Sequence, residues 1–145
     1  IFGIGLNIAA GIGAFVFGFL DDRLGAKRTI QISNYAIFIA VMIAVLASSE
    51  NWFWVAGIIM GIASGPNQSA SRSLMGRIIP KEKTNEFYGF YAFSGKATSF
   101  AGFLLLSIMI LITGSQEIGM LVVSLLLIGG IYILSKVDDQ AKQEI

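Results

Sequence analysis

The chain of 145 residues is strongly apolar: 55% of its residues are hydrophobic, only 13% are charged, and the mean hydropathy is +0.76. Soluble domains carry about 25% charged residues, so the composition argues against a water-soluble globule. The chain has no cysteine and no histidine, which excludes a disulfide framework and metal sites built from thiolate or imidazole ligands.

Five stretches of the sequence are long and apolar enough to cross a bilayer, which takes about 20 residues of helix. They lie near residues 1–20, 29–48, 52–74, 87–113 and 117–135. We therefore predict an all-α membrane protein: a bundle of five transmembrane helices over residues 1–135, followed by a cytoplasmic tail at 136–145. Because the chain starts at Ile1, already inside an apolar run, and has an odd number of spans, we expect it to be part of a larger protein.

Positive charges gather in alternate connections between these stretches. The three basic segments hold Arg23, Lys27 and Arg28; Arg77, Lys81 and Lys83; and Lys136 and Lys142. Near residues 49–51 and 114–117 the only charges are Glu50 and Glu117. The positive-inside rule therefore predicts that the basic segments and the C-terminus are cytoplasmic. We expect a multi-pass integral membrane protein, in the bacterial inner membrane.

The first apolar stretch ends in a charged corner, "GFLDDRLGAKR", at residues 18–28. So short a turn needs Gly25 in a conformation with positive φ. Asp22 can reach the N-terminus of the next helix or a nearby cation. We interpret the corner as a charge-locked hinge between two helices, held on the cytoplasmic side by Arg23, Lys27 and Arg28.

Small residues recur every four positions in two of the stretches. The two sets are Ala10, Ala14 and Gly18 in the first stretch, and Gly57, Gly61 and Gly65 in the third. Small side chains let helices approach closely in lipid, so we expect tight packing here. Pro66 removes a backbone donor and predicts an interruption or kink in the third helix.

The inner half of the third stretch, "SGPNQSASRS", is unusually polar for a membrane span. Asn67 and Gln68 follow Pro66, and Arg72 lies one turn further on. These side chains either bond to adjacent helices or line a transport site, since broken helices often lie near such sites. Arg72 is also close enough to the membrane surface for a purely structural role.

Lys96 is the costliest residue of the chain to place in lipid. It follows the start of the fourth stretch by about ten positions, roughly 14 Å at 1.5 Å per residue. An ionisable group at such a depth is a functional-site hypothesis, and Gly89, Ala92 and Ser99 would form a small, polar-tolerant stripe beside it. The alternatives are a side chain that snorkels to the headgroups and a structural ion pair.

The charged corner, read as G-x-x-x-D-R-x-G-x-K-R, resembles the loop signature of the major facilitator superfamily. In that family the loop is a conformational latch. The resemblance implies that Asp22 is the latch acid, that Arg23, Lys27 and Arg28 are its charge partners, and that Gly18 allows close helix contact.

The second half of the chain resembles the vacuole effluxer type of major facilitator. The matching segments are Gln68–Ser73, Arg77–Pro80, Glu86–Gly89 and Ser94–Gly102. The chain departs from that pattern at Ser69, where alanine is common, and at Phe103, where proline is usual. The resemblance implies helices eight to twelve of a twelve-helix transporter, a partial six-helix half whose N-terminal partner half is missing.

The function that this resemblance implies is secondary active transport of a small polar solute, such as an amino acid, by alternating access. Lys96, Asn67, Gln68 and Arg72 are the candidate substrate or coupling residues. We expect membrane lipid, the solute and the N-terminal half as partners, and no cofactor, metal or nucleic acid. The alternative is a non-transporting membrane scaffold or channel subunit, which small-residue helices would also suit. An enzyme is disfavoured because a Ser–His pair is absent.

Overall fold

The computed structural model describes residues 2–137, without the side chains of Phe2, Leu6, Ala14 and residues 16–22. Its elements are α1 (Phe2–Leu24), α2 (Ala26–Val45), α3 (Glu50–Ile78), the 3-10 turn η1 (Lys81–Lys83), α4 (Thr84–Thr113) and α5 (Gln116–Ser135). Within residues 2–137 there is no strand, so the all-α prediction is confirmed. Each of the five helices begins and ends within four residues of its predicted bounds.

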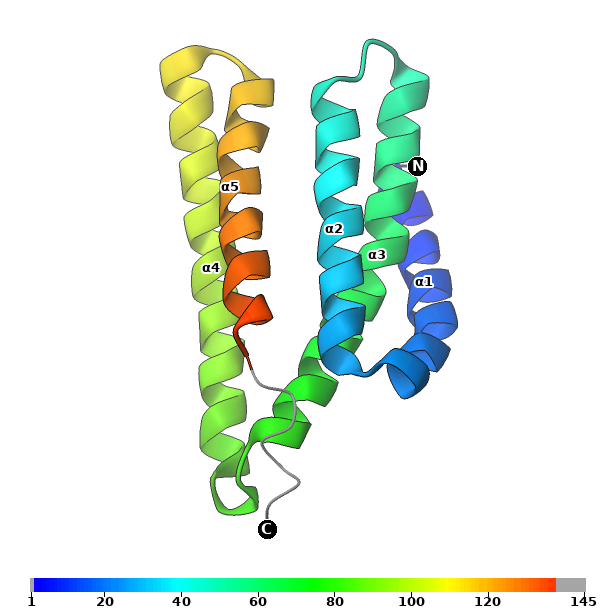
Figure 1. The fold of residues 1–145 in the computed structure, drawn as a ribbon. Helices are drawn as coiled ribbons and strands as arrows, with labels where there is room; N and C mark the ends of the chain where they lie inside the picture. Colours follow the sequence, from blue (N-terminus) through cyan, green and yellow to red (C-terminus); the bar gives the residue numbers. More distant parts are fainter. Residues whose placement is uncertain (1, 138–145) are drawn as a thin grey trace.

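The five helices form two packed groups (Figure 1). α3 is central to the first group, because it packs along both α2 and α1. α4 and α5 form an antiparallel hairpin, and this hairpin meets the first group chiefly where α5 contacts α2. The chain is therefore a three-helix bundle with a helical hairpin attached to one side of it.

Three segments of the described chain are long and apolar enough to cross a membrane: Ala26–Val45, Lys81–Thr113 and Gln116–Ser135. α3 is not among them, and the polar run in its second half accounts for the difference. In α1 the apolar segment found is the shorter Gly3–Gly13. That all five helices span the bilayer, and that residues 136–145 form a cytoplasmic tail, stays a prediction; residues 138–145 lie outside the described part.

The basic segments lie at one end of the molecule. Figure 1 shows the α1–α2 corner, η1 and the end of α5 together at the lower end, whereas the α2–α3 and α4–α5 connections lie at the upper end. This arrangement is what the alternation of charges along the sequence requires. The assignment of the lower end to the cytoplasm stays a prediction.

The backbones of α1 and α3 meet at Gly13, which is buried. A Cβ atom built on Gly13 would lie 2.1 Å from the carbonyl oxygen of Ile62. That oxygen is four residues before Pro66, which has no N–H to donate to it. Close packing of small residues is thus present. On α1, a tight contact is made at Gly13, which the predicted set Ala10, Ala14 and Gly18 omits; the side chain of Ala14 and the surroundings of Gly18 lie outside the described part.

Pro66 does not end or interrupt α3, which continues as one helix to Ile78. The Pro66 side chain is fully buried. In Figure 1 the second half of α3 leans away from α1 towards the foot of α4. The predicted interruption is therefore absent, whereas the lean of the second half of α3 agrees with the predicted kink, because proline removes one backbone hydrogen bond without ending the helix.

A small apolar core joins three helices at the lower end of the molecule. Its buried members are Ala26, Ile30, Ala70 and Leu74, and Ile78 and Leu134 pack against it. It unites the start of α2, the second half of α3 and the end of α5. The charged corner and the polar half of α3 are therefore built on the same packed region.

Candidate functional site

Asn67 faces α2. The half-buried Asn67 donates a hydrogen bond from Nδ2 to the Oδ1 atom of Asn34. This bond pairs one donor of Asn67 with the acceptor oxygen of Asn34 between two helices, a contact that polar side chains commonly make in membrane bundles. Of the two roles that the sequence left open for Asn67, this geometry favours the bond between helices.

Gln68 and Arg72 lie on a different face of α3 from Asn67, and both are exposed. Their side chains make no hydrogen bond with the described part of the chain. The carbonyl oxygen of Arg72, in contrast, accepts a hydrogen bond of 3.2 Å from the hydroxyl group of Tyr88 on α4. This bond shows that the first turns of α4 lie against the polar half of α3.

Lys96 is exposed, and no residue of α4 is buried. It has no hydrogen-bond or ion-pair partner among the backbone groups and side chains that the structure describes. The nearby hydroxyl groups are already used inside the helix, since Ser94 donates to Tyr91 O at 3.0 Å and Ser99 donates to Gly95 O at 2.9 Å. Lys96 thus offers a free cation on a helix whose other residues from Phe87 to Thr113 carry no charge.

The direction of Lys96 follows from two other residues of α4. Tyr88 touches α3, and Leu106 lines a groove shared with α2 and α3, so both mark the flank of α4 that faces the bundle. At 3.6 residues per turn, Ser99 is rotated by about 20° from Tyr88, and Lys96 by about 80°. Lys96 therefore lies at the edge of the bundle-facing flank. The structure places Gln68, Arg72 and Lys96 on uncovered surfaces but forms no direct bond among them.

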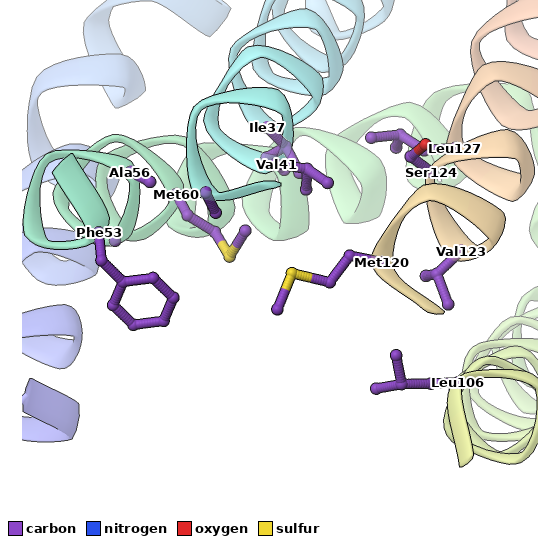
Figure 2. A pocket seen from close by; sticks show the side chains of 12 residues that line it. Ile37, Val41, Phe53, Ala56, Met60, Leu106, Met120, Val123, Ser124 and Leu127 are labelled. Carbon is purple, nitrogen blue, oxygen red and sulfur yellow. The ribbon is translucent and has the colours of Figure 1, made fainter. Parts of the chain in front are cut away.

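A groove separates the two packed groups in the upper part of the molecule (Figure 2). It has a volume of about 480 Å³ and is lined by α2, α3, α4 and α5, with Met60 and Met120 on its opposite sides. Ser124 is its only polar side chain, and that hydroxyl group already bonds to the carbonyl of Leu121 at 2.6 Å. None of the predicted site residues lines the groove. Its apolar walls do not suit a polar solute.

The charged corner has the predicted backbone at Gly25, where φ is +82°. Lys27 is half-buried and donates hydrogen bonds from Nζ to Ser135 O, at 3.1 Å, and to Val137 O. Arg23 and Arg28 are exposed and make no such bond with the described residues. Of residues 16–22, which include Gly18 and Asp22, only the backbone is described. The latch role of Asp22 and the close helix contact at Gly18 therefore stay predictions.

No group of three or more acidic, histidine or cysteine side chains that could hold a metal occurs among the residues described. The chemistry that the exposed groups offer is therefore that of isolated cations and amides: Arg72 and Lys96 can attract an anion, and Gln68 can donate and accept hydrogen bonds.

Comparison with known proteins agrees with the family resemblance. The sequence model of the family described as "Vacuole effluxer Atg22 like" matches residues 1–144. The chain is 26% identical, over 132 residues, to an uncharacterized MFS-type transporter of Bacillus subtilis, YxiO. That match covers 91% of this chain and 31% of the relative.

Fungal proteins are similar at the same level. Autophagy-related protein 22-2 of Emericella nidulans is 28% identical over 143 residues, which covers 85% of this chain and 24% of the relative. Autophagy-related protein 22 of Cryptococcus neoformans is 24% identical over 151 residues, covering 93% of this chain and 28% of that protein. The chain thus spans about a quarter to a third of the length of these relatives. No solved structure gives a significant match.

Proposed function

The chain belongs to the vacuole effluxer Atg22-like family, and we propose that it is the C-terminal part of a secondary active transporter of the major facilitator superfamily. The proposed activity is movement of a small polar solute, such as an amino acid, by alternating access. One observation carries the proposal: Lys96 is an uncovered cation, without a partner among the described groups, in a helix whose other residues from Phe87 to Thr113 carry no charge.

Lys96 supports a binding role because a cation in a membrane helix is costly unless it faces water, a ligand or another protein surface. An amino acid presents a carboxylate, which an ammonium group can pair with. Gln68 and Arg72 are exposed on the neighbouring polar half of α3, so they are the proposed supporting residues. Asn67 is a weaker candidate because Asn34 already holds its amide.

The proposed setting is a bacterial inner membrane, with the end that carries the charged corner and η1 in the cytoplasm. Positive-inside placement of Arg23, Lys81 and Lys83 supports this orientation. The remaining length of the transporter, which the relatives possess, would supply the opposing half of the solute path. The alternative is a non-transporting scaffold or channel subunit. Tight helix packing, as at Gly13, is the only feature of the structure that such a role would need.

The experiment is counterflow of a mixture of radiolabelled amino acids in vesicles that contain the purified full-length protein. We expect saturable exchange that Lys96→Ala lowers by about tenfold or more and that Lys96→Arg partly retains, since Arg keeps the charge. Lys83→Ala is the matched control, because Lys83 is an exposed cation in η1, outside the five α-helices. Exchange no faster than in protein-free vesicles would contradict amino-acid transport. Unchanged exchange in both Lys96 variants would remove Lys96 from the mechanism.

A further inference from the structure

The C-terminal end of α5 is held by a cation from another helix. The last carbonyl groups of a helix have no partner within it, and they form the negative end of the helix dipole. α5 has no basic residue in its own last turn. The cation at its C-cap, Lys136, turns back instead, with Nζ 4.5 Å from the centre of the Tyr132 ring. Lys27, in the first turn of α2, supplies the missing donor to Ser135 O and Val137 O.

Apolar packing lies directly beside this polar contact. Leu134, the residue before Ser135, packs against the core that contains Ala26 and Ile30. Both of these core residues belong to the same first turns of α2 as Lys27. The end of α5 is therefore fixed to the start of α2 by a charge-assisted pair of hydrogen bonds and by the packing of the half-buried Leu134.

At the upper end of α2 and α5, a groove lies between the two packed groups. There the groove of about 480 Å³ lies between α2 and α3 on one side and α4 and α5 on the other. Met60 and Met120 face each other across it (Figure 2). The α4–α5 hairpin is consequently fastened at its lower end and separated from the bundle at its upper end.

We propose that Lys27 is a clasp that fastens the α4–α5 hairpin to the three-helix bundle, and that the hairpin pivots about this contact when the upper groove widens or narrows. Lys27 is then a positioning residue within this part of the protein, and the contact couples the charged corner to the end of α5. Releasing the clasp frees the lower end of α5 while α1, α2 and α3 stay packed.

The chain lacks cysteine, which allows a direct test in the full-length protein after any cysteines elsewhere have been replaced. A Leu134→Cys substitution places a thiol at the clasp, and the rate of its reaction with a maleimide reports how often the contact opens. We expect Lys27→Met to raise this rate about tenfold, in keeping with the loss of hydrogen bonds from a charged donor. Lys27→Arg should keep the slow rate, because it retains charge and donors.

Two controls separate the clasp from general loosening. Arg28→Met removes an exposed neighbouring cation and should leave the rate at Leu134→Cys unchanged. A second thiol, Ala63→Cys, lies buried in α3 and should stay unreactive in Lys27→Met. Equal rates in Lys27→Met and Arg28→Met would overturn the proposal, and so would equal acceleration at both thiols. The assay measures no transport, so its outcome is independent of whether the proposed solute is moved.

Discussion

The side-chain amide of Asn67 on α3 donates a hydrogen bond to the side-chain oxygen of Asn34 on α2. Hydrogen bonds between helices in membrane proteins contribute about 0.6 kcal/mol on average and up to about 1.7 kcal/mol. We therefore predict that Asn67→Ala lowers the free energy of unfolding of the purified protein by an amount in this range. Unfolding in mixed detergent micelles, followed by circular dichroism, measures the effect.

The neighbouring Gln68 is the matched control, because it is an exposed amide with no bond to the described chain. Gln68→Ala should leave the stability unchanged. The double variant Asn34→Ala/Asn67→Ala should lose less than the sum of the single variants, since each single change removes the same bond. Fully additive losses would contradict the pairing of the two amides.

Gly13 and Ile62 give a second prediction, on the packing of α1 against α3. A Cβ atom at position 13 would lie 2.1 Å from the Ile62 carbonyl oxygen and 2.7 Å from its carbon. Because these are backbone atoms, relief requires the helices to separate. Gly13→Ala should therefore cost about 3 kcal/mol or more, the upper range for overpacking. The melting temperature of the purified protein checks this.

Gly11 provides the comparison for that experiment, because a Cβ atom there meets nothing within 4 Å. Gly11→Ala should be neutral or stabilise the helix by up to about 1 kcal/mol, since alanine is the better helix former. A melting temperature for Gly13→Ala equal to that of Gly11→Ala would show that α1 does not approach α3 as closely as the structure has it.

The helices could be predicted from hydropathy because burial in lipid demands long apolar runs whatever the partners are. The positive φ of Gly25 was also predictable, because a corner this short permits few backbone conformations. By contrast, the partner of Asn67 depends on how α2 and α3 are rotated about their axes. Local sequence carries no signal for that rotation, since an amide on either face of α3 gives the same pattern.

Two further features have no signal in the sequence. Lys27 binds carbonyl groups 108 and 110 positions away, and any residue type offers such carbonyls. The upper groove is lined by side chains such as Met60 and Leu106, which would be equally suited to lipid contact. Lys96 could be predicted as a candidate because its charge stands out, but its uncovered position depends on where the α4–α5 hairpin lies.

The hydrogen bond between α3 and α4 gives a third prediction. The Tyr88 hydroxyl group donates to Arg72 O, and Tyr88→Phe removes that group while keeping the ring. The expected loss of stability is about 0.5–1.5 kcal/mol, the net value of one hydrogen bond. Tyr91→Phe, one turn away, should have no effect, because that hydroxyl group makes no hydrogen bond with the described residues. Chemical denaturation of the purified variants compares their stabilities, and identical curves would contradict a stabilising hydrogen bond between Tyr88 and Arg72 O.

The α4–α5 hairpin gives a fourth prediction. Gly119 is buried, and a Cβ atom there would lie 2.7 Å from Cδ1 of Leu106. Since that atom is the end of a flexible side chain, Gly119→Ala should cost about 1 kcal/mol, at the low end of overpacking. A Cβ atom at Gly129, on the same helix, meets nothing within 4 Å, so Gly129→Ala should cost nothing. Melting temperatures should rank Gly129→Ala above Gly119→Ala, and the reverse order would contradict the packing of α4 on α5.

The fifth prediction concerns Gly25 and Gly114, which both have positive φ but lie in different regions of backbone conformation. Gly114 caps α4 with φ 69° and ψ 3°, the left-handed helical region that asparagine also visits. Gly25 has φ 82° and ψ 153° before α2, a region that is nearly restricted to glycine and costs other residues about 1–3 kcal/mol. Gly114→Asn should thus be tolerated, whereas Gly25→Asn and Gly25→Ala should both lower the melting temperature. If Gly25→Asn proved as stable as Gly114→Asn, the backbone at position 25 would have to differ from the one described here, because asparagine does not fit that conformation without strain.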